Sequence, residues 1–209
     1  MAASGEPRPE DPRKQRARAT RRRMVEAAYK LFSERGYTVP LTDVAKEAGV
    51  AVQTVYFTFH TKAELMGAVL ELAVLGDDLP LTPIERPWFA KLLAEPDPRK
   101  ALQIFVDATT EIIERVGPLS PSISRSGDPD VDALWRHSEQ LRIDGYRKIV
   151  EAVVRKGKLR RGLTLDEAVD ITFVLLAPPL YNEVVRLRGW TVDRWRKWMG
   201  QTLADAIFG

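Results

Sequence analysis

The chain of 209 residues contains no cysteine and only two histidines, His60 and His137. The lack of cysteine excludes a disulfide framework, a thiolate nucleophile and a zinc–thiolate site. The two histidines fall in different predicted domains, so they do not form a catalytic pair. The segment 157–162 lacks the spacing of a phosphate-binding glycine loop. We therefore expect no enzyme, no metal site and no cofactor.

Long hydrophobic runs are also missing. The longest is Ile171–Leu180, and it contains Pro178 and Pro179. This is too short to span a bilayer, which takes about 20 residues, and the N-terminal segment lacks the apolar core of a signal peptide. We expect a cytoplasmic protein with no membrane partner.

Charge of one sign is concentrated in one stretch. The whole chain carries a formal net charge of +3. Between Arg13 and Lys62, however, eleven Lys or Arg face four Asp or Glu, so this stretch carries +7 and the remainder −4. Seven of these basic residues lie between Arg13 and Arg23, where no acidic residue occurs. A basic arm of this kind can neutralise DNA phosphates or enter a minor groove.

Two short amphipathic stretches flank Gly49 within residues 40–59. Thr42 is predicted to cap the first helix, and Gly49 to end it in the left-handed conformation. The second helix is predicted over Val52–Phe57, which leaves four side chains for a DNA groove, namely Gln53, Thr54, Tyr56 and Phe57. The alternative is a plain helical hairpin in which Tyr56, Phe57 and Phe59 are buried, but the upstream arginines favour a helix-turn-helix DNA reader.

Four sequence blocks resemble the N-terminal domain of tetracycline-repressor-like (TetR-family) transcription regulators, over roughly residues 16–76. They are Arg21–Tyr37 (RRRMVEAAYKLFSERGY), Leu41–Val50 (LTDVAKEAGV), Thr54–Phe59 (TVYFTF) and Lys62–Leu65 (KAEL). The resemblance implies an all-α homodimer. Its N-terminal domain binds a near-palindromic operator on double-stranded DNA, and its C-terminal domain dimerises and holds a small-molecule effector.

Candidate DNA contacts follow from the basic arm, the recognition helix and the resemblance. They are Arg21, Arg22, Thr42, Gln53, Thr54, Tyr56, Phe57, His60 and Lys62. The chain departs from the usual family pattern at two positions. Ala51 stands where a serine or threonine commonly caps the recognition helix, and Gln53 replaces a common glycine. The first change either weakens the helix start by about 1 kcal/mol or removes a phosphate contact, and the second alters base preference.

The predicted organisation is a disordered basic tail (1–15), a helix-turn-helix domain (16–76, with the motif at 40–59) and a C-terminal helical domain (77–209), about nine helices in all. A proline-rich linker spans 77–98, with one short helix at Trp88–Leu93. Helices are predicted over Arg99–Val116, 131–156, 166–188 and Val192–Phe208, with a loop over Pro118–Pro129 and a kink at Pro178–Pro179.

The last two predicted helices are assigned to the dimer interface, through Ile171, Leu175, Pro179, Trp195, Trp198 and Leu203. The alternative is that the tryptophan-rich tail packs within its own subunit. Aromatic and polar positions predict an apolar effector pocket, lined by Trp88, Phe105, Trp135, His137, Tyr146, Phe173 and Tyr181. We expect a repressor released from DNA by its ligand. The rival interpretation is a helical interaction protein with a helix-turn-helix core that does not bind DNA.

Overall fold

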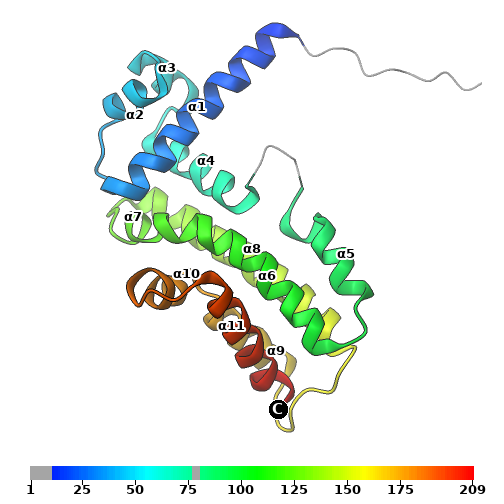
Figure 1. The fold of residues 1–209 in the computed structure, drawn as a ribbon. Helices are drawn as coiled ribbons and strands as arrows, with labels where there is room; N and C mark the ends of the chain where they lie inside the picture. Colours follow the sequence, from blue (N-terminus) through cyan, green and yellow to red (C-terminus); the bar gives the residue numbers. More distant parts are fainter. Residues whose placement is uncertain (1–10, 77–80) are drawn as a thin grey trace, which may run out of the picture.

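The computed structural model describes residues 11–76 and 81–209 and contains no strand within them, which confirms the all-α prediction. Figure 1 shows the arrangement of the helices. In chain order they are α1 (Pro12–Arg35), α2 (Leu41–Ala48), α3 (Val52–Phe59), α4 (Lys62–Leu75), a 3₁₀ turn (Pro83–Glu85), α5 (Pro87–Ala94), α6 (Pro98–Val116), a 3₁₀ turn (Gly117–Leu119), α7 (Ser120–Ser124), α8 (Pro129–Val154), α9 (Leu165–Leu175), α10 (Pro178–Tyr181), a π-helical segment (Asn182–Leu187) and α11 (Val192–Phe208).

The first helix starts earlier than the predicted end of the tail. Asp11 caps α1 because its side chain accepts a hydrogen bond from the Arg13 backbone N–H at 2.9 Å, and Pro12 supplies a φ suited to the first helical position. Residues 12–15 are therefore helical, and the prediction of a tail through residue 15 is wrong for them. Residues 1–10 lie outside the described part of the chain.

The turn between α2 and α3 follows the predicted glycine. Gly49 has φ 65° and ψ 41°, and the Val50 N–H donates to the Ala45 carbonyl at 3.0 Å, which closes α2. The predicted cap at Thr42 is wrong, because Pro40 occupies the cap position and Thr42 lies inside the first turn. Neither Pro40 nor Ala51, which caps α3, makes a side-chain capping bond.

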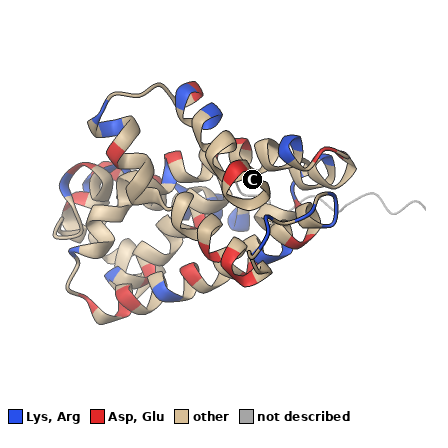
Figure 2. Cartoon of the chain, turned by 90° about the horizontal axis from the view of Figure 1, so that it is seen from below, with Lys and Arg blue, Asp and Glu red and all other residues tan. Residues whose placement is uncertain are grey.

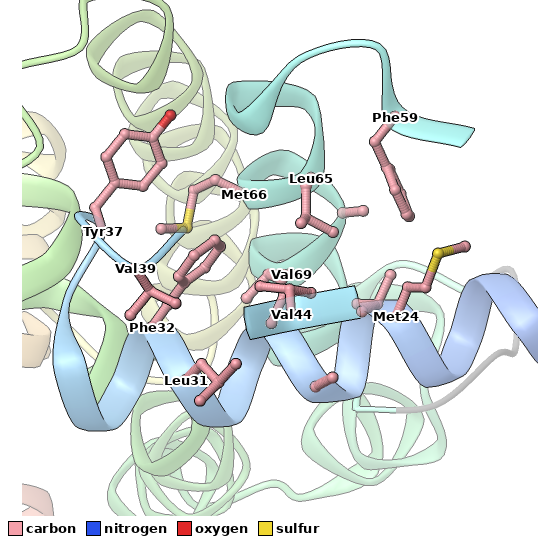
Figure 3. Close-up of a cluster of buried hydrophobic side chains, with 14 of the residues drawn as sticks. Met24, Leu31, Phe32, Tyr37, Val39, Val44, Phe59, Leu65, Met66 and Val69 are labelled. Carbon is pink, nitrogen blue, oxygen red and sulfur yellow. The ribbon is translucent and has the colours of Figure 1, made fainter. Parts of the chain in front are cut away.

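The N-terminal core joins α1 to α4 and extends into the C-terminal part. Figure 3 shows Met24, Phe32, Leu65 and Met66 converging between α1 and α4. The same cluster contains Leu119, Ile123 and Val131, which come from the segments that lead from α6 into α8. Our domain boundary after residue 76 thus stays a proposal, since residues beyond it complete the first core.

The C-terminal part is built around α6, against which α4, α5, α8 and α11 pack. Its core contains Leu102, Phe105, Val153, Trp195 and Leu203, each 1% exposed or less. Asp97 begins α6 by accepting hydrogen bonds from the Arg99 and Lys100 backbone N–H groups, at 2.8 and 3.2 Å. The residues of this second core therefore lie on helices, and the central helix α6 begins at the Asp97 cap.

Two predicted segments differ from the structure. The predicted loop Pro118–Pro129 contains α7, because a proline fits the first turn of a short helix. The predicted single helix 166–188 is divided into α9, α10 and the π-helical segment. Pro178 and Pro179 lack N–H donors and cannot continue α9, but they can open α10.

No single helix in the described ranges has both the length and the apolar character needed to cross a membrane. One bent pair, α9 with the segment Pro178–Leu187, passes this test jointly, with a bend of 44°.

Candidate nucleic-acid interface

The second helix of the motif, α3, divides its side chains between the core and the surface. Val55 and Phe59 are 0% and 4% exposed, whereas Tyr56 and Phe57 are 54% and 86% exposed. Gln53 is also exposed. Figure 1 shows α2 and α3 at the end of the molecule opposite the C-terminus. The helix therefore presents a polar and aromatic face that the domain itself does not cover.

Two threonines border this face. Thr54 is half-buried, and its backbone carbonyl accepts a hydrogen bond from the Thr58 hydroxyl at 2.8 Å. Thr42 is exposed in the first turn of α2. Within the ranges that the structure describes, its hydroxyl has no hydrogen-bond partner, as a phosphate contact requires.

The basic residues of the predicted arm lie on α1, so they are held on a helix and are distributed around it. Residues 11–19 and 21–23 are exposed. The Arg21 guanidinium lies 5.1 Å from the centroid of the Phe59 ring, which joins the arm to the recognition helix. Arg22 forms an ion pair with Glu26 at 2.8 Å, so DNA would compete with a carboxylate for it. Figure 2 shows basic and acidic residues interspersed over the helices in that view.

His60 lies in the turn between α3 and α4. Its φ of 37° is in the left-handed region, where a residue with a side chain is strained. The exposed ring places Nδ1 3.3 Å from the Glu64 Oε2. This geometry makes His60 an exposed residue beside α3, compatible with a phosphate contact.

Lys62 differs from its predicted placement. Its side chain is half-buried, and Nζ lies 4.6 Å from the centroid of the Tyr37 ring and 5.9 Å from that of Phe32. Burial lowers the pKa of Lys62, and the negative charge of Asp128 opposes this by raising it. The ammonium group therefore lies beside the Tyr37 ring, and its predicted phosphate contact stays a prediction.

Polar contacts that the sequence did not reveal connect this domain to the C-terminal part. The Tyr37 hydroxyl donates to Asp128 Oδ2 at 2.7 Å, and the Tyr29 hydroxyl donates to the Arg115 carbonyl at 2.9 Å. The Arg115 guanidinium in turn donates to the Ala73 carbonyl of α4 at 2.8 Å. These partners lie far apart in sequence, so helical periodicity gives no indication of them.

The predicted pocket residues do not all lie in one cluster. Trp88 stacks on Phe105 with ring centroids 6.2 Å apart, and Phe105 meets the edge of Tyr146 at 5.1 Å. Phe173 and Tyr181 belong to the same core cluster.

Two of the predicted pocket residues lie apart from this cluster. Trp135 packs against the N-terminal cluster, and His137 is exposed on α8. A groove of about 290 Å³ lies between α6 and α11, and none of the predicted pocket residues lines it. Its lining residues are Arg99, Gln103, Lys197, Gly200, Gln201 and Ala204.

The residues predicted for the dimer interface fall into two groups, one buried within the subunit and one at least partly exposed. Trp195 and Leu203 are fully buried within the subunit, and Trp195 Nε1 donates to the Thr110 hydroxyl at 3.2 Å, so the assignment of these two to a subunit surface is wrong. Trp198 is 38% exposed, Pro179 is exposed, and Ile171 and Leu175 are half-buried. Val174 of α9, which is adjacent to Leu175, is 63% exposed.

Comparison with known proteins gives a match at the motif. Residues 24–69 match the family model described as bacterial regulatory proteins, tetR family. Over 82 residues the chain is 37% identical to an uncharacterized HTH-type transcriptional regulator, TtgW, of Pseudomonas putida, covering 37% of this chain and 61% of the relative. It is also 37% identical over 82 residues to the HTH-type transcriptional regulator SrpR of Pseudomonas putida, covering 38% of that protein. These matches span less than two thirds of either relative.

Solved structures resemble the fold over most of the chain. The transcriptional regulator FadR from Bacillus subtilis in complex with stearoyl-CoA has a TM-score of 0.71 and 15% identity, with 89% of this chain and 98% of that chain covered. NalD, the secondary repressor of the MexAB-OprM multidrug efflux pump in Pseudomonas aeruginosa, has a TM-score of 0.67 and 19% identity, with 92% and 98% covered. At these identities the likeness concerns the fold.

Proposed function

Since residues 24–69 carry the N-terminal domain of the TetR family, we propose that this protein is a sequence-specific DNA-binding regulator of transcription that responds to a small ligand. The observation that carries the proposal is the open face of α3, where Gln53, Tyr56 and Phe57 are exposed while Val55 and Phe59 anchor the helix. Tyr56 and Phe57 form an exposed aromatic pair beside the polar Gln53, so this face is open for contact with another molecule.

The contacts divide by chemistry. Gln53 can pair with an adenine edge through two hydrogen bonds, and Thr54 can contact a base or a thymine methyl group. Thr42 and Tyr56 carry hydroxyl groups suited to phosphate oxygens, which fix the register of the helix without reading sequence. The basic residues of α1 add an attraction to the DNA backbone, and the strength of this attraction depends on the salt concentration.

The protein acts as a homodimer on a near-palindromic operator in this proposal. Two recognition helices then enter successive major grooves about 34 Å apart. The exposed apolar side chains Val174, Leu187 and Trp198, from α9 to α11, are candidates for the subunit contact. Sedimentation at micromolar concentration tests this, and a monomer there contradicts it.

The effector acts by favouring one arrangement of the DNA-binding domains, and it shifts that equilibrium only by its differential affinity for the two arrangements. The aromatic set Trp88, Phe105 and Tyr146 supports a mostly apolar ligand. We propose that the protein is a repressor and that the ligand releases it from DNA.

Binding to duplex DNA at several salt concentrations tests the proposal. Affinity should fall steeply as salt rises, since each neutralised phosphate releases counterions. Tyr56→Phe should weaken binding to every duplex alike, while Gln53→Ala should change base preference at one position in each half-site. Absent or salt-insensitive binding contradicts the proposal and favours a helical interaction protein that does not bind DNA.

A further inference from the structure

The carboxylate of Asp128 accepts hydrogen bonds from two different parts of the fold. Asp128 precedes α8, and its Oδ1 accepts a hydrogen bond from the Asp130 backbone N–H at 3.0 Å, which caps the helix. Its Oδ2 accepts the Tyr37 hydroxyl at 2.7 Å. Tyr37 lies in the connection between α1 and α2, so this bond joins the helix-turn-helix domain to the start of α8.

Lys62 occupies the same junction from the first residue of α4. Its Nζ lies over the Tyr37 ring at 4.6 Å from the centroid, on the ring whose hydroxyl Asp128 holds. Figure 3 shows that Tyr37 lies near Phe32 and Met66, at the edge of the N-terminal core. A cation placed over an aromatic ring is stabilised by about 0.5–1 kcal/mol at an exposed site and by more when desolvated.

The electrostatics agree with this placement. The hydrogen bond from Tyr37 lowers the pKa of Asp128, so its carboxylate is ionised at neutral pH. Burial lowers the pKa of Lys62, and the charge of Asp128 counteracts that effect. The carboxylate therefore favours a charged lysine in the position over Tyr37.

We propose that Asp128 is a positioning residue for DNA binding, which holds Tyr37 and Lys62 against the C-terminal helices and so competes with DNA phosphate for the Lys62 ammonium group. This inference rests on the proposed function, because it assumes that Lys62 turns outward to contact phosphate when DNA binds. Asp128 caps α8, so a displacement of α8 also moves the carboxylate away from or toward Lys62. The junction thus couples the C-terminal helices to one phosphate contact.

The test removes the charge of Asp128 and keeps its cap. Asparagine and serine both cap helices well, so Asp128→Asn and Asp128→Ser should retain α8, as circular dichroism and thermal unfolding can verify. Affinity is measured on a fixed, non-specific duplex of about 30 base pairs at low salt, because a phosphate contact does not depend on sequence. Both variants should bind this duplex about two- to fivefold more tightly, the range expected for a partly exposed charge interaction.

Two matched variants isolate the effect. Asp130→Asn removes the same charge two residues away, at an exposed side chain that makes no hydrogen bond to Tyr37, and should change affinity much less. In a Lys62→Met background, Asp128→Asn should no longer tighten binding. Equal effects of Asp128→Asn and Asp130→Asn, or the same gain with and without Lys62, overturn the inference while leaving the regulator proposal intact. A wild-type protein that does not bind DNA overturns both.

Discussion

A substitution at Phe57 can separate an effect on DNA affinity from an effect on the stability of the fold. Its side chain is 86% exposed on α3, whereas that of Phe59, two residues further along the same helix, is 4% exposed. We predict that Phe57→Ala weakens DNA binding without destabilising the protein, because the residue contributes little to the core. Alanine also has a higher helix propensity than phenylalanine, so the free energy of unfolding should stay the same or rise by up to about 0.5 kcal/mol.

The expected loss of affinity follows from the surface area of the Phe57 side chain that is exposed in the free protein. Burying a whole phenylalanine side chain is worth about 1.5–3 kcal/mol, and nearly all of that surface is still exposed in the free protein. If the groove covers most of the ring, Phe57→Ala should cost about 1–2 kcal/mol for each recognition helix, which is about five- to thirtyfold per helix and about 30- to 900-fold for a dimer that uses both helices. A fluorescence anisotropy titration with a labelled duplex would measure this.

Phe59→Ala is the matched control. Because Phe59 is buried and carries Arg21 over its ring, its truncation should lower the free energy of unfolding by about 3–5 kcal/mol. Chemical denaturation of both variants gives the comparison. The reasoning is refuted if Phe57→Ala destabilises the fold by several kcal/mol, or if it leaves DNA affinity unchanged.

Three further predictions concern stability. Gly49→Ala should destabilise the protein by about 1–2 kcal/mol because φ at Gly49 is 65°, while Gly145→Ala, inside α8 with open space around it, should stabilise by about 0.5–1 kcal/mol; urea unfolding compares them. Trp195→Ala should lower the free energy of unfolding by about 3–5 kcal/mol, and a near-neutral result would show that Trp195 is not in the core. Asp128 has a lowered pKa in the fold, so its stabilising effect should be present above the unfolded pKa of about 3.9 and vanish as pH falls through the folded value. The melting temperatures of wild-type and Asp128→Asn should accordingly converge in acid, and a constant difference would contradict the assignment.

The motif itself could be predicted from sequence because its determinants are local. The left-handed turn at Gly49 is set by one residue type, and a three-residue spacing from Val52 leads to the buried Val55. The cap at Thr42 could not be placed correctly, since Pro40 already fits the helix start and moves the cap two residues toward the N-terminus. Boundaries of this kind depend on which of two adequate caps the tertiary structure uses.

The placement of Lys62 could not be predicted, because it depends on a contact between distant segments. Tyr37 and Asp128 are 91 residues apart, and nothing in the helical pattern of either indicates the other. The burial of Trp195 could not be predicted for the same reason. An apolar position on α11 faces either its own subunit or a partner, and only the packing of α11 on α6 decides between them.

Selection of bound duplexes from a random pool shows whether α3 reads DNA sequence. We expect a recovered near-palindrome whose half-sites are centred about 34 Å apart, one helical turn of DNA. Gln53→Ala should alter one base position in each half-site, as expected for the residue that reads an adenine edge. A pool that stays random after several rounds with the wild-type protein would contradict the claim that α3 reads DNA sequence.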